Sequence, residues 1–151
     1  MLSFEESLKI LKETKDLIEG YFILSSGLHS PKYVQCAQLM SKPSQAAQIC
    51  ESLAKKIKSK LNDIDLILSP AMGGIVVGYE IGKLLGIETI FSERVYGKFV
   101  LRRDFKIKQG ANVLIVEDVI TTGKSSIECS TLVTVNKANI SGYACIIDRS
   151  N

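Results

Sequence analysis

Two neighbouring carboxylates and the turn after them are the residues of this 151-residue chain best suited to chemistry. Glu117 and Asp118 follow the apolar run 113–116, which is typical of a buried strand. Carboxylates at a strand end can hydrogen-bond sugar hydroxyls or hold a hydrated Mg²⁺. The next stretch, Thr-Thr-Gly-Lys-Ser at 121–125, opens a predicted helix whose N–H groups can bind phosphate. The pattern favours a ligand with a diol close to a phosphate.

Two other interpretations of this stretch remain open. Gly-Lys-Ser at 123–125 resembles the end of a Walker A loop, but the first glycine of that pattern would fall on Asp118. An acid there would repel the triphosphate that such a loop encloses. The second interpretation is that Glu117 and Asp118 merely cap the following helix, which is common for one acid and less common for two.

The second half of the chain has the rhythm of a parallel sheet. Short apolar runs alternate with helical stretches, which is typical of βαβ units with right-handed crossovers. The strands are expected at about 65–69, 87–91, 113–116 and 143–147, and the helices at about 74–85 and 123–137. Because ligands bind beyond the carboxyl ends of such strands, the two carboxylates lie at the expected ligand edge.

The first half is predicted to hold two amphipathic helices and a hairpin. Apolar residues at helical spacing predict a helix over 4–19, stopped by Gly20, and residues 21–36 favour a hairpin or loop. Pro43 fits the first turn of a second helix. The lysine run over 55–60 on that helix is predicted to be a solvated face.

Composition favours one globular domain over 1–151, with a net charge of only +3 and a single histidine, His29. A histidine-rich metal site is therefore excluded. Four scattered cysteines without CxxC spacing indicate reduced thiols rather than a zinc site. The acidic N-terminus and the lack of a long apolar run predict a soluble, cytoplasmic protein.

The segment 93–108 carries six basic and two acidic residues, so its net charge of +4 exceeds that of the whole chain. It is either a charged hairpin in solvent or a mobile lid. Arg94 and Lys98 flank its Tyr96-Gly97 centre and are the best candidates to reach a phosphate.

Three further stretches could approach a ligand. Small residues at 70–74 would let backbone N–H groups come close to it, although they could equally form only a tight turn. Ser25-Ser26-Gly27 could also be only a turn. Arg149 follows the last strand and is either a surface charge or a bidentate partner for a carboxylate.

The stretch 113–125 closely resembles the phosphoribosyl-pyrophosphate (PRPP) signature of the type I phosphoribosyltransferases, and the whole chain resembles the orotate phosphoribosyltransferases. The narrower resemblance is carried by 20–33, similar to the family's N-terminal hood motif, by 69–75, similar to its pyrophosphate loop, and by 92–103, similar to its mobile catalytic loop. The resemblance implies an α/β type I phosphoribosyltransferase fold. In that fold a mostly parallel central sheet is flanked by helices, and residues 1–40 contribute a small hood.

The resemblance also implies roles for individual residues. The residues expected to bind PRPP are Glu117, Asp118, Val119, Ile120, Thr121, Thr122, Gly123, Lys124, Ser125, Ala71, Met72 and Gly73. Those expected to bind orotate are Thr121, Arg149, Ser25 and Phe22, and those expected to act in catalysis are Lys98, Arg94 and Asp118. Mg²⁺ is expected to be held mainly through PRPP, with Asp118 as a further ligand.

The implied reaction transfers a 5-phosphoribosyl group from PRPP to orotate, giving orotidine 5′-monophosphate and pyrophosphate in pyrimidine biosynthesis. A homodimer is expected, with the loop 93–108 serving the neighbouring subunit. A purine phosphoribosyltransferase and a non-catalytic nucleotide-sensing regulator are the alternatives. Ser25 stands where many members have Lys, Lys124 replaces a smaller residue, and the chain ends at Asn151, where members normally continue.

Overall fold

The computed structural model describes residues 1–15, 17–23 and 29–150. In chain order the elements are α1 (Phe4–Glu13), β1 (Leu17–Ile23), β2 (His29–Val34), α2 (Ala37–Met40), α3 (Pro43–Lys60), β3 (Leu66–Pro70), α4 (Gly73–Leu85), β4 (Thr89–Val95), β5 (Lys98–Leu101), β6 (Asn112–Ile120), α5 (Lys124–Val135) and β7 (Asn139–Asp148). The expected α/β class is confirmed. None of the helices in these described residues is long and apolar enough to cross a membrane.

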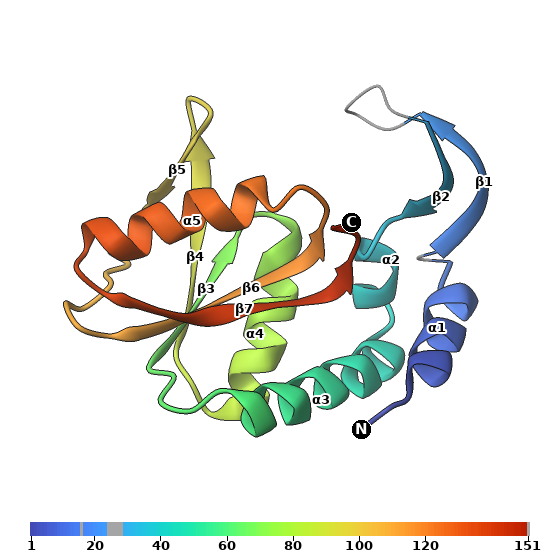
Figure 1. Ribbon diagram of the computed structural model, residues 1–151, viewed down its shortest axis with the longest axis horizontal. Coiled ribbons are helices and arrows are strands. Elements are labelled where there is room, and N and C mark those ends of the chain that lie inside the picture. The colour runs from blue at the N-terminus through green and yellow to red at the C-terminus, as the bar shows by residue number, and fades with distance from the viewer. Residues whose placement is uncertain (16, 24–28, 151) are drawn as a thin grey trace.

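The main sheet has the strand order β5-β4-β3-β6-β7. Strand β3 pairs in parallel with β4 and β6, β6 pairs in parallel with β7, and only β5 is antiparallel to its neighbour. Helix α5 covers one face, and α3 and α4 cover the other (Figure 1). The strands and crossover helices therefore meet the expectation of a mostly parallel sheet with βαβ units.

Alternation along the strands divides the core between these two faces. In β6, Val113 and Ile115 belong to the cluster that contains Cys129 and Val133 of α5. Leu114 and Val116 belong to the cluster that contains residues of α3 and α4. Both faces are apolar because helices cover both, so the strand reads as an unbroken hydrophobic run.

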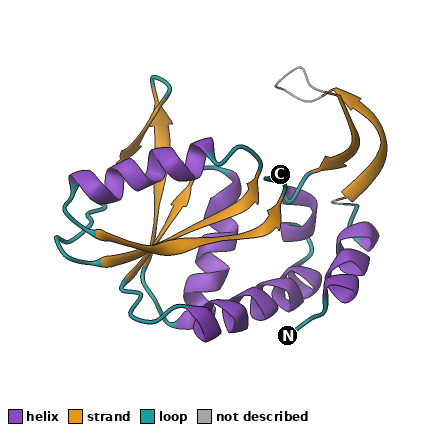
Figure 2. Cartoon of the chain, in the orientation of Figure 1, coloured by secondary structure: helices purple, strands orange, loops and turns teal. Residues whose placement is uncertain are grey.

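Two hairpins project toward the top of the view in Figure 2. The hairpin of β1 and β2 forms a separate two-stranded antiparallel sheet, and we call it the hood. It is the hairpin alternative of the hairpin or loop expected over 21–36, although it begins earlier, at Leu17. The hairpin of β4 and β5 extends the main sheet and turns at Tyr96-Gly97. We call it the arm.

The predicted helix over 4–19 is wrong over residues 14, 15 and 17–19. Helix α1 ends at Glu13, the Thr14 hydroxyl donates to the carbonyl oxygen of Ile10 at 2.9 Å, and Lys15 has a φ of 61°. Ile18, within the predicted helix, instead lies in β1 opposite Tyr33 and is 39% exposed. Pairing with β2 overrides the apolar spacing that had favoured a longer helix.

Candidate functional site

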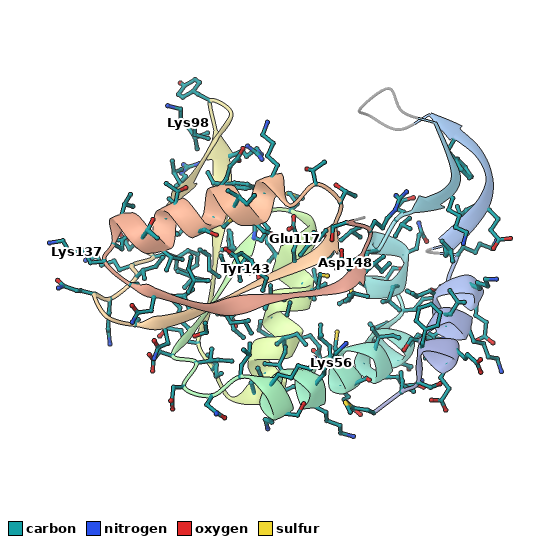
Figure 3. All side chains as sticks on the ribbon, in the orientation of Figure 1. Lys56, Lys98, Glu117, Lys137, Tyr143 and Asp148 are labelled. Carbon is teal, nitrogen blue, oxygen red and sulfur yellow. The ribbon has the colours of Figure 1, made fainter. Side chains whose placement is uncertain are left out.

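The two carboxylates, Glu117 and Asp118, lie within strand β6 near its carboxyl end, because the strand runs to Ile120 and does not end at Val116. Successive side chains of a strand point to opposite faces. Glu117 accordingly faces α5, where Ser126 Oγ donates to its Oε2 at 2.5 Å. Figure 3 shows Glu117 close to the carboxyl end of β6, beside α5. Asp118 faces the opposite helix layer.

Burial raises the pKa of the Glu117 carboxyl, and the neighbouring Asp118 charge adds to this, while the hydrogen bond from Ser126 opposes it. A half-buried carboxylate with one oxygen already bonded has one oxygen left for a ligand. Glu117 is therefore suited to a fixed hydrogen bond to a hydroxyl group.

Asp118 lies against the loop that joins β3 to α4. A Cβ atom on Gly73 would stand 2.7 Å from Asp118 Cγ, which is closer than real Cβ contacts come. The Asp118 carboxylate also accepts the Val119 N–H at 2.9 Å. Because Gly73 has no side chain, the Asp118 carboxylate can lie directly against the candidate pyrophosphate loop.

The loop itself, Ala71–Gly73, leads from β3 into α4. The Ala71 N–H donates to the carbonyl oxygen of Ser92 at 2.8 Å, the Ala71–Met72 peptide bond is cis, and the Met72 side chain is exposed. Its backbone thus lies at the carboxyl end of β3, beside the middle of β4 and next to Asp118. These three PRPP candidates are brought to the same edge as the signature residues.

The stretch Thr121–Ser125 forms a turn into α5. Gly123 adopts a left-handed conformation with φ 72°, which glycine tolerates without strain. Thr121 and Thr122 are exposed, and the Lys124 N–H is 3.4 Å from Thr122 Oγ1. The amino end of a 12-residue helix, framed by hydroxyls, is well suited to bind a phosphate.

Arg149 lies beside this turn. Strand β7 pairs with β6 up to Asp148, and the Arg149 N–H then donates to the carbonyl oxygen of Ile120 at 2.8 Å. Arg149 and Lys32 of the hood line one cavity of about 350 Å³ whose other walls are largely apolar. Thr121 and Arg149, both expected to bind orotate, are thus adjacent.

The other two orotate candidates belong to the hood region. Phe22 lies in β1 opposite Ser30 and is half-buried. Ser25 lies outside the described residues, so its expected role stays a prediction.

The arm carries two of the three catalytic candidates, Lys98 and Arg94, and they differ in their surroundings. Lys98 is exposed at the start of β5, at the tip labelled in Figure 3. Arg94 instead lies against α5, with its Nη1 2.7 Å from Glu128 Oε2. Its guanidinium also stacks 4.1 Å from the centroid of the Phe99 ring.

The segment 93–108 is not one lid, which corrects the sequence interpretation of its charge. Only its first part forms the arm. Because β5 runs antiparallel to β4, the chain returns to the amino edge of the sheet, where Lys106 and Lys108 line a cavity with Asp65 and Glu88. Their charges therefore stand at the end of the sheet opposite the carboxylates.

Sequence reasoning missed two residues of α5, Ser126 and Glu128. Ser126 holds Glu117, and Glu128 holds Arg94. The available signal was helical spacing after the phosphate turn, because residues two positions apart, such as Ser126 and Glu128, point to different sides of one helix. The lysines over 55–60, in contrast, are exposed on α3 as predicted.

Asp118 is the residue whose surroundings fit a magnesium ion. Carboxylate oxygens suit Mg²⁺, which usually takes one or two carboxylates and completes its shell with water and substrate phosphates. Among the described residues no group of three or more His, Cys, Asp or Glu side chains could hold a metal.

Residues 35–151 match the phosphoribosyl transferase domain family. The chain is 44% identical to an orotate phosphoribosyltransferase of Rhizorhabdus wittichii over 148 residues, which is 97% of this chain and 76% of the relative. It is 47% identical to that of Chlorobium phaeobacteroides over 142 residues, 94% of this chain and 72% of the relative. The chain belongs to the orotate phosphoribosyltransferase family.

Solved structures agree with this family on the fold. The orotate phosphoribosyltransferase of Aeropyrum pernix superimposes with a TM-score of 0.79 at 23% identity, over 93% of this chain and 80% of that one. Adenine phosphoribosyltransferase of Saccharomyces cerevisiae follows with a TM-score of 0.75 at 20% identity, over 93% and 89%. The fold is thus shared by orotate and adenine phosphoribosyltransferases. The 44–47% sequence identity to orotate phosphoribosyltransferases is what assigns the chain to that narrower family.

Proposed function

We propose that this chain transfers the 5-phosphoribosyl group of PRPP to orotate. The C1–O bond to pyrophosphate breaks, and a bond forms between C1 and a ring nitrogen of orotate, which loses its proton. The products are orotidine 5′-monophosphate and pyrophosphate. The observation that carries the proposal is the meeting of Asp118, the 121–125 turn, the 71–73 loop and Arg149 at one sheet edge, in a member of this family.

The sugar and its phosphate would be bound by strand β6 and the turn after it. Glu117 and Asp118 would accept hydrogen bonds from the ribose hydroxyls, and their negative charge would favour the positive charge that develops on the ribose as the C1–O bond breaks. The backbone from Val119 to Ser125 would bind the 5′-phosphate through the amino end of α5. Holding both ends of the sugar fixes C1 relative to the acceptor.

The acceptor would be bound at Arg149. A guanidinium can pair with a carboxylate through two parallel hydrogen bonds, and orotate carries a carboxylate. The mainly apolar cavity beside it would accept the flat face of the ring. Thr121, next to Arg149, and Phe22 of the hood are the further residues expected to bind orotate. A purine base has no such carboxylate, so Arg149 favours orotate over the purine alternative.

The leaving pyrophosphate would lie over the Ala71–Gly73 loop. When bound, Mg²⁺ supplies positive charge that stabilises the leaving group, and Asp118 is the residue that would hold it from the protein side. Lys98, at the tip of the arm, would add a second positive charge and help exclude water.

A homodimer is supported by an exposed apolar stripe on α4. Met72, Val76 and Tyr79 follow at helical spacing and are 83%, 51% and 65% exposed. A second copy of the chain could cover this stripe. The stripe begins in the 71–73 loop, so the partner would lie next to the site and could present its own arm there. The cytoplasmic location remains a prediction.

The activity is tested by following orotate consumption with PRPP and Mg²⁺, with adenine and hypoxanthine as competing acceptors. We expect turnover that depends on orotate, and turnover with a purine alone would replace this proposal with the purine alternative. Arg149→Gln should raise KM for orotate at least tenfold, about 1.4 kcal/mol in binding, with KM for PRPP little changed.

The shared arm is tested by mixing two inactive variants, Lys98→Ala and Asp118→Asn. If the arm serves the partner, random pairing in a 1:1 mixture restores about one quarter of the wild-type activity, because half the dimers then hold one complete site. If the arm serves its own chain, the mixture stays inactive. Tyr79→Glu should give monomers in size-exclusion chromatography.

A further inference from the structure

Helix α5 contacts both the phosphate turn and the arm. It begins directly after Gly123, and it lies against strand β5. Two side-chain contacts join it to the arm: Glu128 with Arg94, and Cys129 Sγ with Ser92 Oγ at 3.2 Å. The helix that would bind the 5′-phosphate is thus the same helix that holds the base of the arm.

Arg94 is engaged on three sides in this structure. Its Nη1 lies 2.7 Å from Glu128 Oε2 and donates to the carbonyl oxygen of Gly97 at 2.8 Å. Its guanidinium stacks on Phe99, whose ring is buried in the core on the α5 face. These contacts link the tip of the arm, the core and α5 through one side chain. A guanidinium with a planar fork suits such a role better than an ammonium group does.

Lys98 and Arg94 were expected to share one role, but their surroundings separate them. Lys98 is exposed at the tip, whereas the Arg94 and Glu128 side chains are 39% and 30% exposed. To reach a phosphate, Arg94 would have to give up an ion pair, a backbone hydrogen bond and an aromatic contact. Lys98 can meet a phosphate without breaking any of these.

We propose that Glu128 and Arg94 act as a pair of positioning residues that fix the arm to α5 and so orient Lys98 for the reaction. This rests on the proposed function, in which Lys98 approaches the pyrophosphate. Arg94 then acts through the shape of the arm and not by contact with the substrate.

The test is a double-mutant cycle with Glu128→Ala, Arg94→Ala and the variant that carries both. We expect each single variant to lower kcat about fivefold with KM for orotate unchanged, and the double variant to lose no more than either single one. The matched control is Glu93→Ala, which removes the acid of the other ion pair of the arm, Glu93 with Arg103, and leaves α5 untouched. Its kcat should stay within about twofold of wild type.

Limited trypsin digestion supplies a readout that does not depend on turnover. Glu128→Gln keeps every trypsin site, and we expect cleavage after Lys98 and Arg102 to be several times faster than in the wild type, with an unchanged circular dichroism spectrum. The proposal is overturned if Arg94→Ala lowers kcat ten times more than Glu128→Ala, since Arg94 would then act on the phosphates directly. It is also overturned if Glu128→Gln is digested like the wild type. A wild-type chain that does not turn over orotate would overturn the proposed function alone, because digestion still tests the tether.

Discussion

Glu117 and Asp118 are neighbours in the sequence, but they belong to opposite faces of the sheet. Glu117 faces α5, is half-buried and is held by Ser126. Asp118 faces α4 and lies over Gly73, where a glycine leaves room for it. On one face of β6 the Glu117 carboxylate is oriented by the Ser126 hydroxyl. On the other face the Asp118 carboxylate occupies the space that a side chain at Gly73 would fill.

The difference separates what the two acids can do. A carboxylate with one oxygen bonded and its pKa raised by burial suits a steady hydrogen bond to a sugar hydroxyl. A carboxylate that lies at the pyrophosphate loop can meet both the sugar and a metal ion. We therefore expect Asp118 to matter more for turnover, and the predictions below test this comparison from its largest effect to its smallest.

The largest effect is expected from Asp118→Asn, which keeps the shape of the side chain and removes its charge. Turnover should fall more than tenfold, a loss of at least about 1.4 kcal/mol of transition-state stabilisation. Glu117→Gln should cost about threefold, because Ser126 and a ligand hydroxyl can still bond the amide. Steady-state kinetics with saturating PRPP and orotate measures both, and equal losses would remove the distinction between the two faces.

Gly73→Ala should come next, with a loss of about tenfold in kcat/KM for PRPP. The new Cβ would displace the Asp118 carboxylate, which it would otherwise meet at 2.7 Å from Cγ. The matched control is Gly86→Ala at the other end of α4, where no atom lies within 4 Å of the new Cβ but φ is 71°. That variant should lose about 1 kcal/mol of stability and keep its turnover, so equal kinetics in the two variants would speak against the Asp118 contact.

Ser126→Ala should have a smaller effect, about threefold in kcat/KM for PRPP. It removes the hydrogen bond that orients Glu117 and leaves the backbone of α5 intact. Ser126→Thr restores the hydroxyl and should recover most of the activity. If Ser126→Ala behaves like wild type, Glu117 is held by packing alone.

The buried thiols should show the smallest difference between the two faces, because on both faces burial should slow the reaction of the thiol with an alkylating reagent. Burial raises the pKa of Cys129, on the α5 face, to about 11, and that of Cys50, on the α4 face, to about 12. The reactive thiolate is the minor form below these values, so alkylation by iodoacetamide should be slow at pH 8 and rise about tenfold per pH unit while the fold persists. Site-resolved mass spectrometry measures this, with the chain unfolded in guanidinium as the control. Fast labelling of either cysteine at pH 8 would contradict its burial.

The sequence predicts the second half of the fold well, and the reason is local. The strands β3, β4, β6 and β7 each contain a short apolar run, and a helix follows β3 and β6. The parallel sheet and the edge that carries Glu117, Asp118 and Arg149 therefore follow from patterns within a few residues. The 121–125 turn is equally local, since Gly123 adopts the left-handed conformation that its residue type permits. These features needed no knowledge of distant contacts.

The features that the sequence did not predict depend on contacts between distant segments. Helix α1 ends early because residues 17–23 pair with β2, and a helical spacing pattern contains nothing about that pairing. Lys106 and Lys108 lie at the amino edge because β5 runs antiparallel to β4 and carries the chain away from the site. The tie between Arg94 and Glu128 spans 34 positions of the sequence and is visible only once α5 packs on the arm.

The two edges of the main sheet differ in a way that bears on how the chain must be handled. Strand β5 closes one edge with four residues, Lys98–Leu101, whereas β7 forms the other with ten, Asn139–Asp148, whose single charged residue is the last. A long, uncharged edge is a template for strand addition from another molecule. Copies that met along β7 would extend one sheet through both molecules instead of joining through α4. Raising the protein concentration would then drive two associations at once, and only the one through α4 would bring two sites together.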